Sequence, residues 1–175
     1  MRAVTALIVA TMLVMVSAPA RAQAERQRPF AWDVARAVLI DPTTFAPALI
    51  SYEATQQDWK TSQIFFANGW LEQNALFTVS GRPNDRPVAY GEGVRRIRSE
   101  ALTVLAYSAF NNAGAGVLER LFVERYPKRK RLIRTLSWVE RIAFASVLTY
   151  RASAHHFRQA SNNRRLAREY RYTYP

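Results

Sequence analysis

The stretch ALTVLAYSAFNNAGAGVL, residues 101–118, decides the fold, because it carries no charged residue and lies inside a longer helical pattern. That pattern begins near Val94 and continues to about Tyr126. Pro127 ends it, and the basic cluster Lys128 to Arg131 follows, where the C-terminus of a helix favours cations. The sequence therefore predicts one long helix with an uncharged middle and a basic end.

The rest of the chain also shows helical spacing of apolar residues, and no run of alternating strand residues interrupts it. Asp41-Pro42 stops a short first helix, because the residue before proline is pushed out of the helical region. The turn-rich segment from Gly81 to about Gly93 is expected to be irregular. We predict an all-α bundle of about five helices over residues 32–40, 46–52, 58–77, 94–126 and 130–171. The second is capped by Thr43 or Thr44, and the last has a candidate break at residues 160–163.

The first twenty-two residues have the features of an export signal. Arg2 is the positive start, residues 3–16 are an uncharged apolar run, and small-residue cleavage sites follow. Fourteen helical residues reach about 21 Å, less than the roughly 30 Å hydrocarbon core of a bilayer. We expect a signal peptide over residues 1–22, with an uncleaved anchor as the alternative and cleavage after Ala20, Ala22 or Ala24.

The expected domain organisation follows from this signal. A flexible arm over residues 23–31 leads into one helical domain over residues 32–175. The protein is expected to be exported to the periplasm and to lie at or in a membrane.

The chain has a formal charge of +12, from 25 Lys and Arg against 13 Asp and Glu. Such an excess favours polyanionic partners, and the export signal points to an anionic membrane surface or a membrane protein complex rather than to nucleic acid. The absence of cysteine excludes disulfides, thiol catalysis and thiolate metal sites. Candidate residues for binding an anionic surface, with an ordinary solvated surface as the equal alternative, are Arg95, Arg96, Arg98, Lys128, Arg129, Lys130 and Arg131.

Membrane insertion is the main alternative that the sequence leaves open. Residues 101–118 are long enough to span, but Asn111 and Asn112 lie in the middle and would need protein partners. The flanking segments 82–98 and 120–134 hold five and seven basic residues, so spanning would place one of them outside, against the positive-inside tendency. The sequence thus favours a helical domain that rests on the membrane, with integral insertion as the second interpretation.

No catalytic or metal-binding motif is recognisable, and no cofactor is expected. His155 and His156 are adjacent, so a regular helix turns them about 100° apart and they cannot share a metal. On a continuous helix, Asp58 and Glu72 would lie about 21 Å apart, too far to act as an acid and base pair. Candidate buried polar residues, which we expect to form ion pairs or hydrogen bonds between helices, are Asp58, Ser62, Glu72, Asn74, Asn111, Asn112, Glu140 and Arg151.

Residues 58–74 carry a spaced pattern, Asp58, Thr61-Ser62, Gly69, Glu72 and Asn74. This pattern resembles an uncharacterised family of small bacterial integral membrane proteins, whose members have D-x-x-T-T, six residues, then G-x-x-E-x-N-P on a membrane helix. The chain departs from it with Ser62 for the second threonine and Ala75 for the proline. The resemblance implies a membrane-associated helical protein and attaches no reaction to it.

Three functions are therefore compatible with the sequence. The first is an exported, membrane-associated helical protein of structural or interaction character. The second is an integral membrane bundle that forms part of a larger complex or a small transport unit. The third is an exported enzyme that uses a buried carboxylate such as Glu72. The oligomeric state is left open.

Overall fold

The computed structural model describes residues 29–173, and within this range the protein is all-α, as predicted. Its α-helices there are α2 (Phe30–Leu39), α3 (Pro42–Ala67), α4 (Tyr90–Arg125) and α5 (Lys130–Glu169), with 3₁₀ turns η1 (Ala75–Phe77) and η2 (Pro127–Arg129). The expected number of about five helices is not confirmed, because the second and third predicted helices are one. The predicted signal peptide lies outside the described residues.

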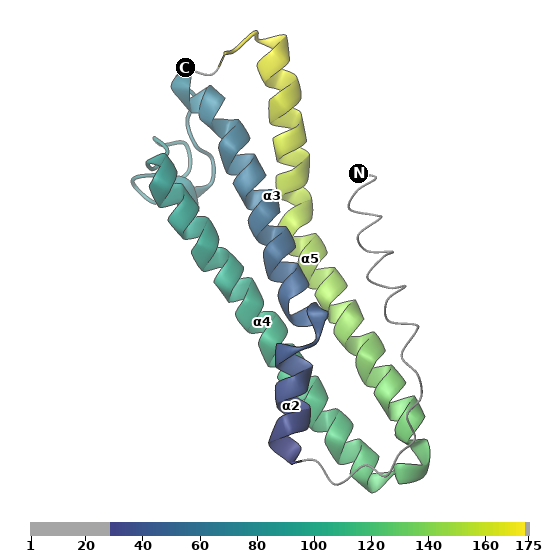
Figure 1. The fold of residues 1–175 in the computed structure, drawn as a ribbon. Helices are drawn as coiled ribbons and strands as arrows, with labels where there is room; N and C mark the ends of the chain where they lie inside the picture. Colours follow the sequence, from purple (N-terminus) through teal and green to yellow (C-terminus); the bar gives the residue numbers. More distant parts are fainter. Residues whose placement is uncertain (1–28, 174–175) are drawn as a thin grey trace.

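The three long helices form an elongated bundle, shown in Figure 1. Ser51 contacts Ala152 and Asp58 contacts His156, so α3 and α5 run in the same direction and α4 runs against both. α4 and α5 form a hairpin through η2 that extends below the start of α3, and α2 packs against α4 (Figure 1). The top of the bundle therefore gathers the end of α3, the start of α4 and the end of α5.

α3 begins at Pro42, with Asp41 as its N-cap. The Asp41 carboxylate accepts a hydrogen bond from the backbone N–H of Thr43 at 3.0 Å, so the cap lies two or three residues earlier than the predicted Thr43 or Thr44. Pro47 is accommodated within the helix, and no break follows at residue 52. This continuity is what joins the second and third predicted helices.

The end of α3 corrects the predicted helix over residues 58–77. The helix stops at Ala67, and Gly69 has φ +85°, the left-handed conformation that favours glycine. The N–H of Trp70 donates to Phe65 O at 3.0 Å and the N–H of Gly69 to Phe66 O at 3.1 Å, which is the Schellman arrangement. The Trp70 ring packs edge-on against Phe65, 5.3 Å between centroids, and completes this stop. Residues 68–77 therefore turn back over α3 instead of extending it.

A loop over residues 68–89 then crosses the top of the bundle. Isolated β-bridges between Glu72 and Asp85 and between Thr78 and Pro87 tie its two halves together. α4 begins at Tyr90, so Gly91 and Gly93, predicted to be irregular, are helical. α5 runs unbroken through residues 160–163, where a break was a candidate.

Large apolar side chains are buried mainly at this top end. Trp59, Phe77, Val88 and Ile97 form a cluster that we call the aromatic end. Trp59 stacks on Phe77 with 5.2 Å between ring centroids, and its indole N–H donates to Tyr90 O at 3.2 Å. Gly93 lies directly against this indole: a Cβ there would come within 2.3 Å of Trp59 Cε2. The packing of α4 on α3 at this level thus requires glycine.

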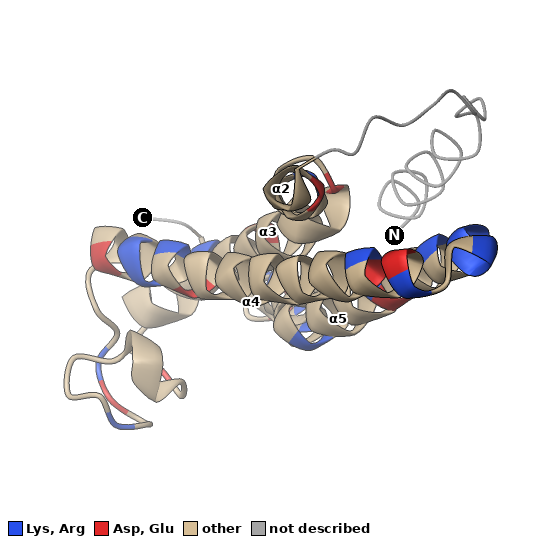
Figure 2. Ribbon diagram, turned by 90° about the horizontal axis from the view of Figure 1, so that it is seen from below, with Lys and Arg blue, Asp and Glu red and all other residues tan. Residues whose placement is uncertain are grey.

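The middle of the bundle has the opposite composition. No charged residue occurs in residues 42–52 of α3, 101–118 of α4 or 142–150 of α5, which we call the charge-free zone. In Figure 2, the central part of α4 is correspondingly without Lys, Arg, Asp or Glu between charged ends. Residues buried in this zone are small or polar: Thr44, Pro47, Ala48, Ser51, Ser108, Asn112, Gly116 and Ala145.

Several of the largest apolar side chains of the charge-free zone are exposed, and the others are half-buried. Phe110 is 83% exposed, Tyr150 68% and Leu49 67%. Water-soluble domains bury such residues in their cores, whereas packed membrane helices put small residues at their interfaces and large ones toward lipid. By length and composition, one stretch of the described chain, Phe30–Ala67, is long and apolar enough to cross a membrane.

Candidate functional site

A polar cavity of about 430 Å³ lies at the top of the bundle, between α3, α5 and the loop that follows α3. α3 contributes Asp58 and Ser62, the loop contributes Glu72, and α5 contributes His156 and Asn163. Aromatic side chains complete the walls: Trp59, Phe65, Phe66, Trp70 and Phe77. The volume falls within the range of small-molecule sites.

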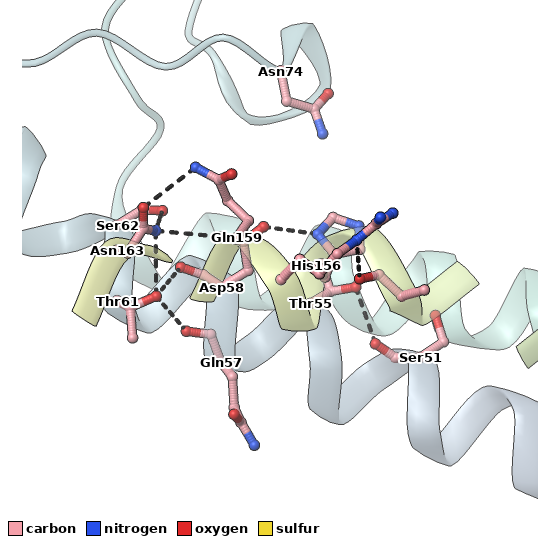
Figure 3. Close-up of polar contacts among 12 residues, drawn as sticks. Ser51, Thr55, Gln57, Asp58, Thr61, Ser62, Asn74, His156, Gln159 and Asn163 are labelled. Carbon is pink, nitrogen blue, oxygen red and sulfur yellow. Dashed lines mark hydrogen bonds and ion pairs between the residues drawn. The ribbon is translucent and has the colours of Figure 1, made fainter. Parts of the chain in front are cut away.

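Asp58 is the centre of a hydrogen-bond network along one wall of this cavity (Figure 3). Its Oδ2 lies 2.8 Å from Nδ1 of His156, and its Oδ1 lies 3.4 Å from the amide nitrogen of Asn163. The same amide lies 3.0 Å from the Ser62 hydroxyl and 3.3 Å from the Thr61 hydroxyl. Because Asn163 is 5% exposed, its contacts fix the register of α5 against α3.

The turn at Gly69 reverses the chain and places Glu72 in the wall of the cavity. The backbone of Glu72 is held by two hydrogen bonds to Asp85, and its carboxylate accepts from the backbone N–H of Asn74 at 2.7 Å. Burial raises the pKa of Glu72, the backbone N–H groups of Asn74 and Gln73 lower it, and the charge of Asp58 raises it further. The expected separation of about 21 Å from Asp58 is therefore wrong: the helix ends, and both carboxylates line one cavity.

The geometry does not form a nucleophilic triad. The Ser62 hydroxyl contacts the Asn163 amide, while the histidine that meets Asp58 uses Nδ1 for that contact. Among residues 29–173, no group of three or more histidine and carboxylate side chains is placed to hold a metal ion. The arrangement combines a histidine–carboxylate pair with a second carboxylate, and such a site suits binding of a positively charged group or exchange of a proton.

A second buried polar group, the Arg141 cluster, closes the other end of the charge-free zone. The Nε of Arg141 lies 3.0 Å from Asp41 Oδ2, and its Nη1 donates to Glu119 Oε2 at 3.3 Å and to Ser137 Oγ at 2.8 Å. Arg141 is only 9% exposed. The cluster joins the start of α3 to α4 and α5, and its three charged members are the residues that bound the zone on each helix.

The candidate buried polar residues divide into three groups. Asp58, Ser62 and Glu72 lie partly buried in the polar cavity. Asn112 is 1% exposed and donates to the hydroxyls of Thr43 and Thr44, whereas the buried Nδ2 of its neighbour Asn111 has no hydrogen-bond partner in the described structure. The expectation of burial is wrong for three residues that are exposed: Asn74, Glu140 and Arg151.

The two basic segments do not form a single surface. Arg95, Arg96 and Arg98 lie near the top of α4, whereas Lys128 to Arg131 lie at η2 and the start of α5, at the far end of the hairpin. Arg95 and Arg96 also form ion pairs with Glu92, and Arg96 donates to backbone carbonyls of the loop. Arg95 and Arg96 therefore stabilise the start of α4 and the loop, whereas Lys128 to Arg131 form a basic tip at the far end of the hairpin.

Sequence reasoning missed Arg141, Asp41, His156 and Asn163 as partners in buried networks. The spacing of charges along α5 pointed to Glu140 and Arg151 instead, which lie nearly in line on that helix. A usable signal was present, because Asp41, Glu119 and Arg141 each border an uncharged run. For His156 and Asn163, seven residues apart on one helical face, the partner lies about a hundred residues earlier and no local pattern identifies it.

Comparison of the chain with protein-family models, curated proteins and solved structures finds no match to any of them.

Proposed function

We propose that the protein is an integral membrane helical bundle, with the charge-free zone of α3, α4 and α5 in the hydrocarbon layer and the polar cavity at one end of it. The observation that carries the proposal is the inverted side-chain distribution of this zone. Buried positions there are small or polar, and Phe110, Leu49 and Tyr150 are exposed. This distribution supports packing of helices in lipid.

The length and polarity of the zone agree with this proposal. Along α4 it spans eighteen residues, about 27 Å of helix, close to the roughly 30 Å hydrocarbon core. Asn112, which would be costly toward lipid, is 1% exposed and bonded to Thr43 and Thr44. Insertion of α5 requires that its charges be paired inside the bundle or lie at the headgroups. Arg141 is paired inside, whereas the exposed Glu140 and Arg151 would have to reach the headgroups from either end of a nine-residue uncharged run.

The resemblance of residues 58–74 supports the same proposal. Asp58, Ser62, Glu72 and Asn74 of the pattern line the polar cavity, Thr61 contacts Asn163, and Gly69 makes the turn that brings Glu72 in. All six positions of the pattern therefore lie in the cavity wall or in the contacts and the turn that form it. Export by residues 1–22 remains part of the proposal. Membership of a larger complex is a further part of it. The apolar groove of about 960 Å³ between the lower parts of α4 and α5 is the surface proposed for contact with a partner.

A peripheral protein held at the surface by its exposed basic tip is the second candidate. Lys128, Arg129 and Arg131 are exposed at the end of the hairpin, which favours contact with anionic headgroups. Basic residues lie at both ends of the bundle, so the positive-inside tendency does not choose an orientation.

Single-cysteine labelling distinguishes the two candidates, because the chain has no cysteine of its own. Phe110→Cys and Val147→Cys place a thiol in the charge-free zone, and Arg98→Cys and Lys128→Cys place one at either end. In sealed vesicles with a membrane-impermeant maleimide, we expect the two zone variants to stay unlabelled until detergent is added. Arg98→Cys and Lys128→Cys should react from opposite sides of the membrane.

Labelling of all four variants from the same side of intact vesicles would contradict insertion and favour the peripheral candidate. Extraction with alkaline carbonate is an independent check, since an integral bundle stays in the membrane and a peripheral domain is released.

A further inference from the structure

We propose that the polar cavity at the top of the bundle binds a small organic cation through an ammonium group. This inference goes beyond placement in a membrane, and it depends on the cavity alone. It can therefore succeed or fail independently of the labelling experiment.

The charge of the cavity differs from that of the whole protein. The chain carries +12, yet among residues 29–173 no Lys or Arg lines the cavity, while Asp58 and Glu72 both do. Basic side chains near it are engaged elsewhere: Arg164 donates to Gln57, and Arg165 pairs with Glu169. A negatively charged recess in a basic protein selects a cation and repels anionic ligands such as phosphates.

The two carboxylates differ in how they are satisfied. Asp58 contacts His156 and Asn163, which orient its carboxylate. The Glu72 carboxylate accepts a hydrogen bond from one backbone N–H group and faces the cavity. Loss of solvation is what raises its pKa, and an ammonium group beside it would restore the lost electrostatic stabilisation.

Aromatic rings supply the second part of an ammonium site. Trp59, Phe66 and Phe77 contribute to the cavity wall but pack on one another, with ring centroids 5.6 Å apart for Trp59 and Phe66 and 5.2 Å apart for Trp59 and Phe77. Trp70, which also lines the cavity, is 45% exposed and has the accessible ring. Ring faces attract ammonium ions, and an aromatic wall beside a carboxylate is the arrangement that recognises them best. A bare metal ion fits less well, because the described residues provide no cluster of three carboxylate or histidine ligands.

Fluorescence titration of the full-length protein in nanodiscs of phosphatidylglycerol tests the proposal, because Trp59 and Trp70 report on the cavity. The probe is choline, and the control is 3,3-dimethylbutan-1-ol, a neutral molecule of the same shape. We expect a saturable change with choline and none with the alcohol. Equal binding of both would overturn the proposal, as would no binding of choline.

Two variants distinguish loss of the Glu72 charge from loss of the folded structure. Glu72→Gln should weaken choline binding by about tenfold, the effect of one favourable charge contact in a partly buried site. Glu53→Gln, at an exposed carboxylate on α3 outside the cavity, should bind as the wild type does. If Glu72→Gln fails to fold, Trp70→Leu at the exposed rim replaces it and should also weaken binding. Unchanged affinity in the folded variant would contradict the site.

The ammonium group could belong to a free cation or to a lipid headgroup. Competition by short-chain phosphatidylcholine, added to the same nanodiscs, distinguishes them. Displacement of choline would support a headgroup as the ligand, and binding of choline without displacement would support a free small cation.

Discussion

The aromatic end and the charge-free zone use the same three helices but pack them in opposite ways. At the aromatic end, Trp59, Phe77 and Ile97 are buried together under a loop, as in the core of a soluble domain. In the charge-free zone, two serines, one threonine, one asparagine and small residues are buried, and several of the largest apolar side chains are exposed. The difference is the one expected if, as proposed, the surroundings of the bundle change along its length, from water to an apolar phase.

The largest loss of stability is expected from a change in the Arg141 cluster, which lies between the charge-free zone and the basic tip. Arg141→Ala removes one partner of a buried ion cluster and leaves Asp41 and Glu119 without their shared cation. Breaking such a cluster costs about 3–5 kcal/mol. Denaturant unfolding of the detergent-solubilised protein measures the loss. Arg131→Ala at the exposed tip is the control, and equal effects of the two changes would contradict the structural role of the cluster.

A second change tests the tight packing of the aromatic end. Gly93→Ala places a methyl group against the Trp59 indole, where no space exists, and overpacking of this kind costs about 1–3 kcal/mol. Gly91→Ala, two residues earlier on the same helix and with nothing within 4 Å of the added atom, should leave stability unchanged or slightly increased. The fluorescence of Trp59 should shift in the first variant alone. Equal free energies of unfolding for the two variants would contradict tight packing of Gly93 against Trp59.

Asn111 and Asn112 are adjacent residues of the charge-free zone, and their replacement is expected to affect stability differently. Asn112→Ala breaks the link from α4 to Thr43 and Thr44 and leaves their hydroxyls without a donor, at a cost of about 1–3 kcal/mol. Asn111→Ala removes a buried amide that has no hydrogen-bond partner, so stability should hold or rise. Thermal unfolding in detergent measures both. The reverse order of effects would show that Asn111 has a partner in the membrane.

The smallest expected effect is a pH dependence at the cavity. Burial raises the pKa of Glu72 above its ordinary 4.5, so the folded protein binds this proton more tightly than the unfolded chain does. Its contribution to stability is therefore greatest below pH 4.5 and falls as the pH rises through the raised pKa. Glu72→Gln removes that fall, so the stability of this variant relative to the wild type should increase as the pH rises from 4.5 through the raised pKa. Glu53→Gln is the exposed control, and a parallel pH trend in both variants would contradict burial of Glu72.

The sequence predicted the helical class and the long helix around residues 101–118, because uncharged runs and proline stops are local signals. It failed at Gly69, where the helical pattern of apolar residues continued past a Schellman stop formed by Asn68 and Gly69. That error separated Asp58 from Glu72 and concealed the cavity. Pairings such as Asp58 with His156 could not be predicted, because they depend on the relative register of helices far apart in the chain.

The polar cavity also has a consequence for biosynthesis. Its walls come from α3 and from the last third of α5, and the Asp58–His156 contact joins residues 98 positions apart. Nascent chains are built from the N-terminus, so this contact cannot form until the ribosome has added residue 156. A chain that stops before residue 156 retains α2, α3 and α4 but lacks one wall of the cavity. One wall of the cavity is therefore absent until α5 has been synthesised, whereas α3 and the loop that form the other walls are present much earlier.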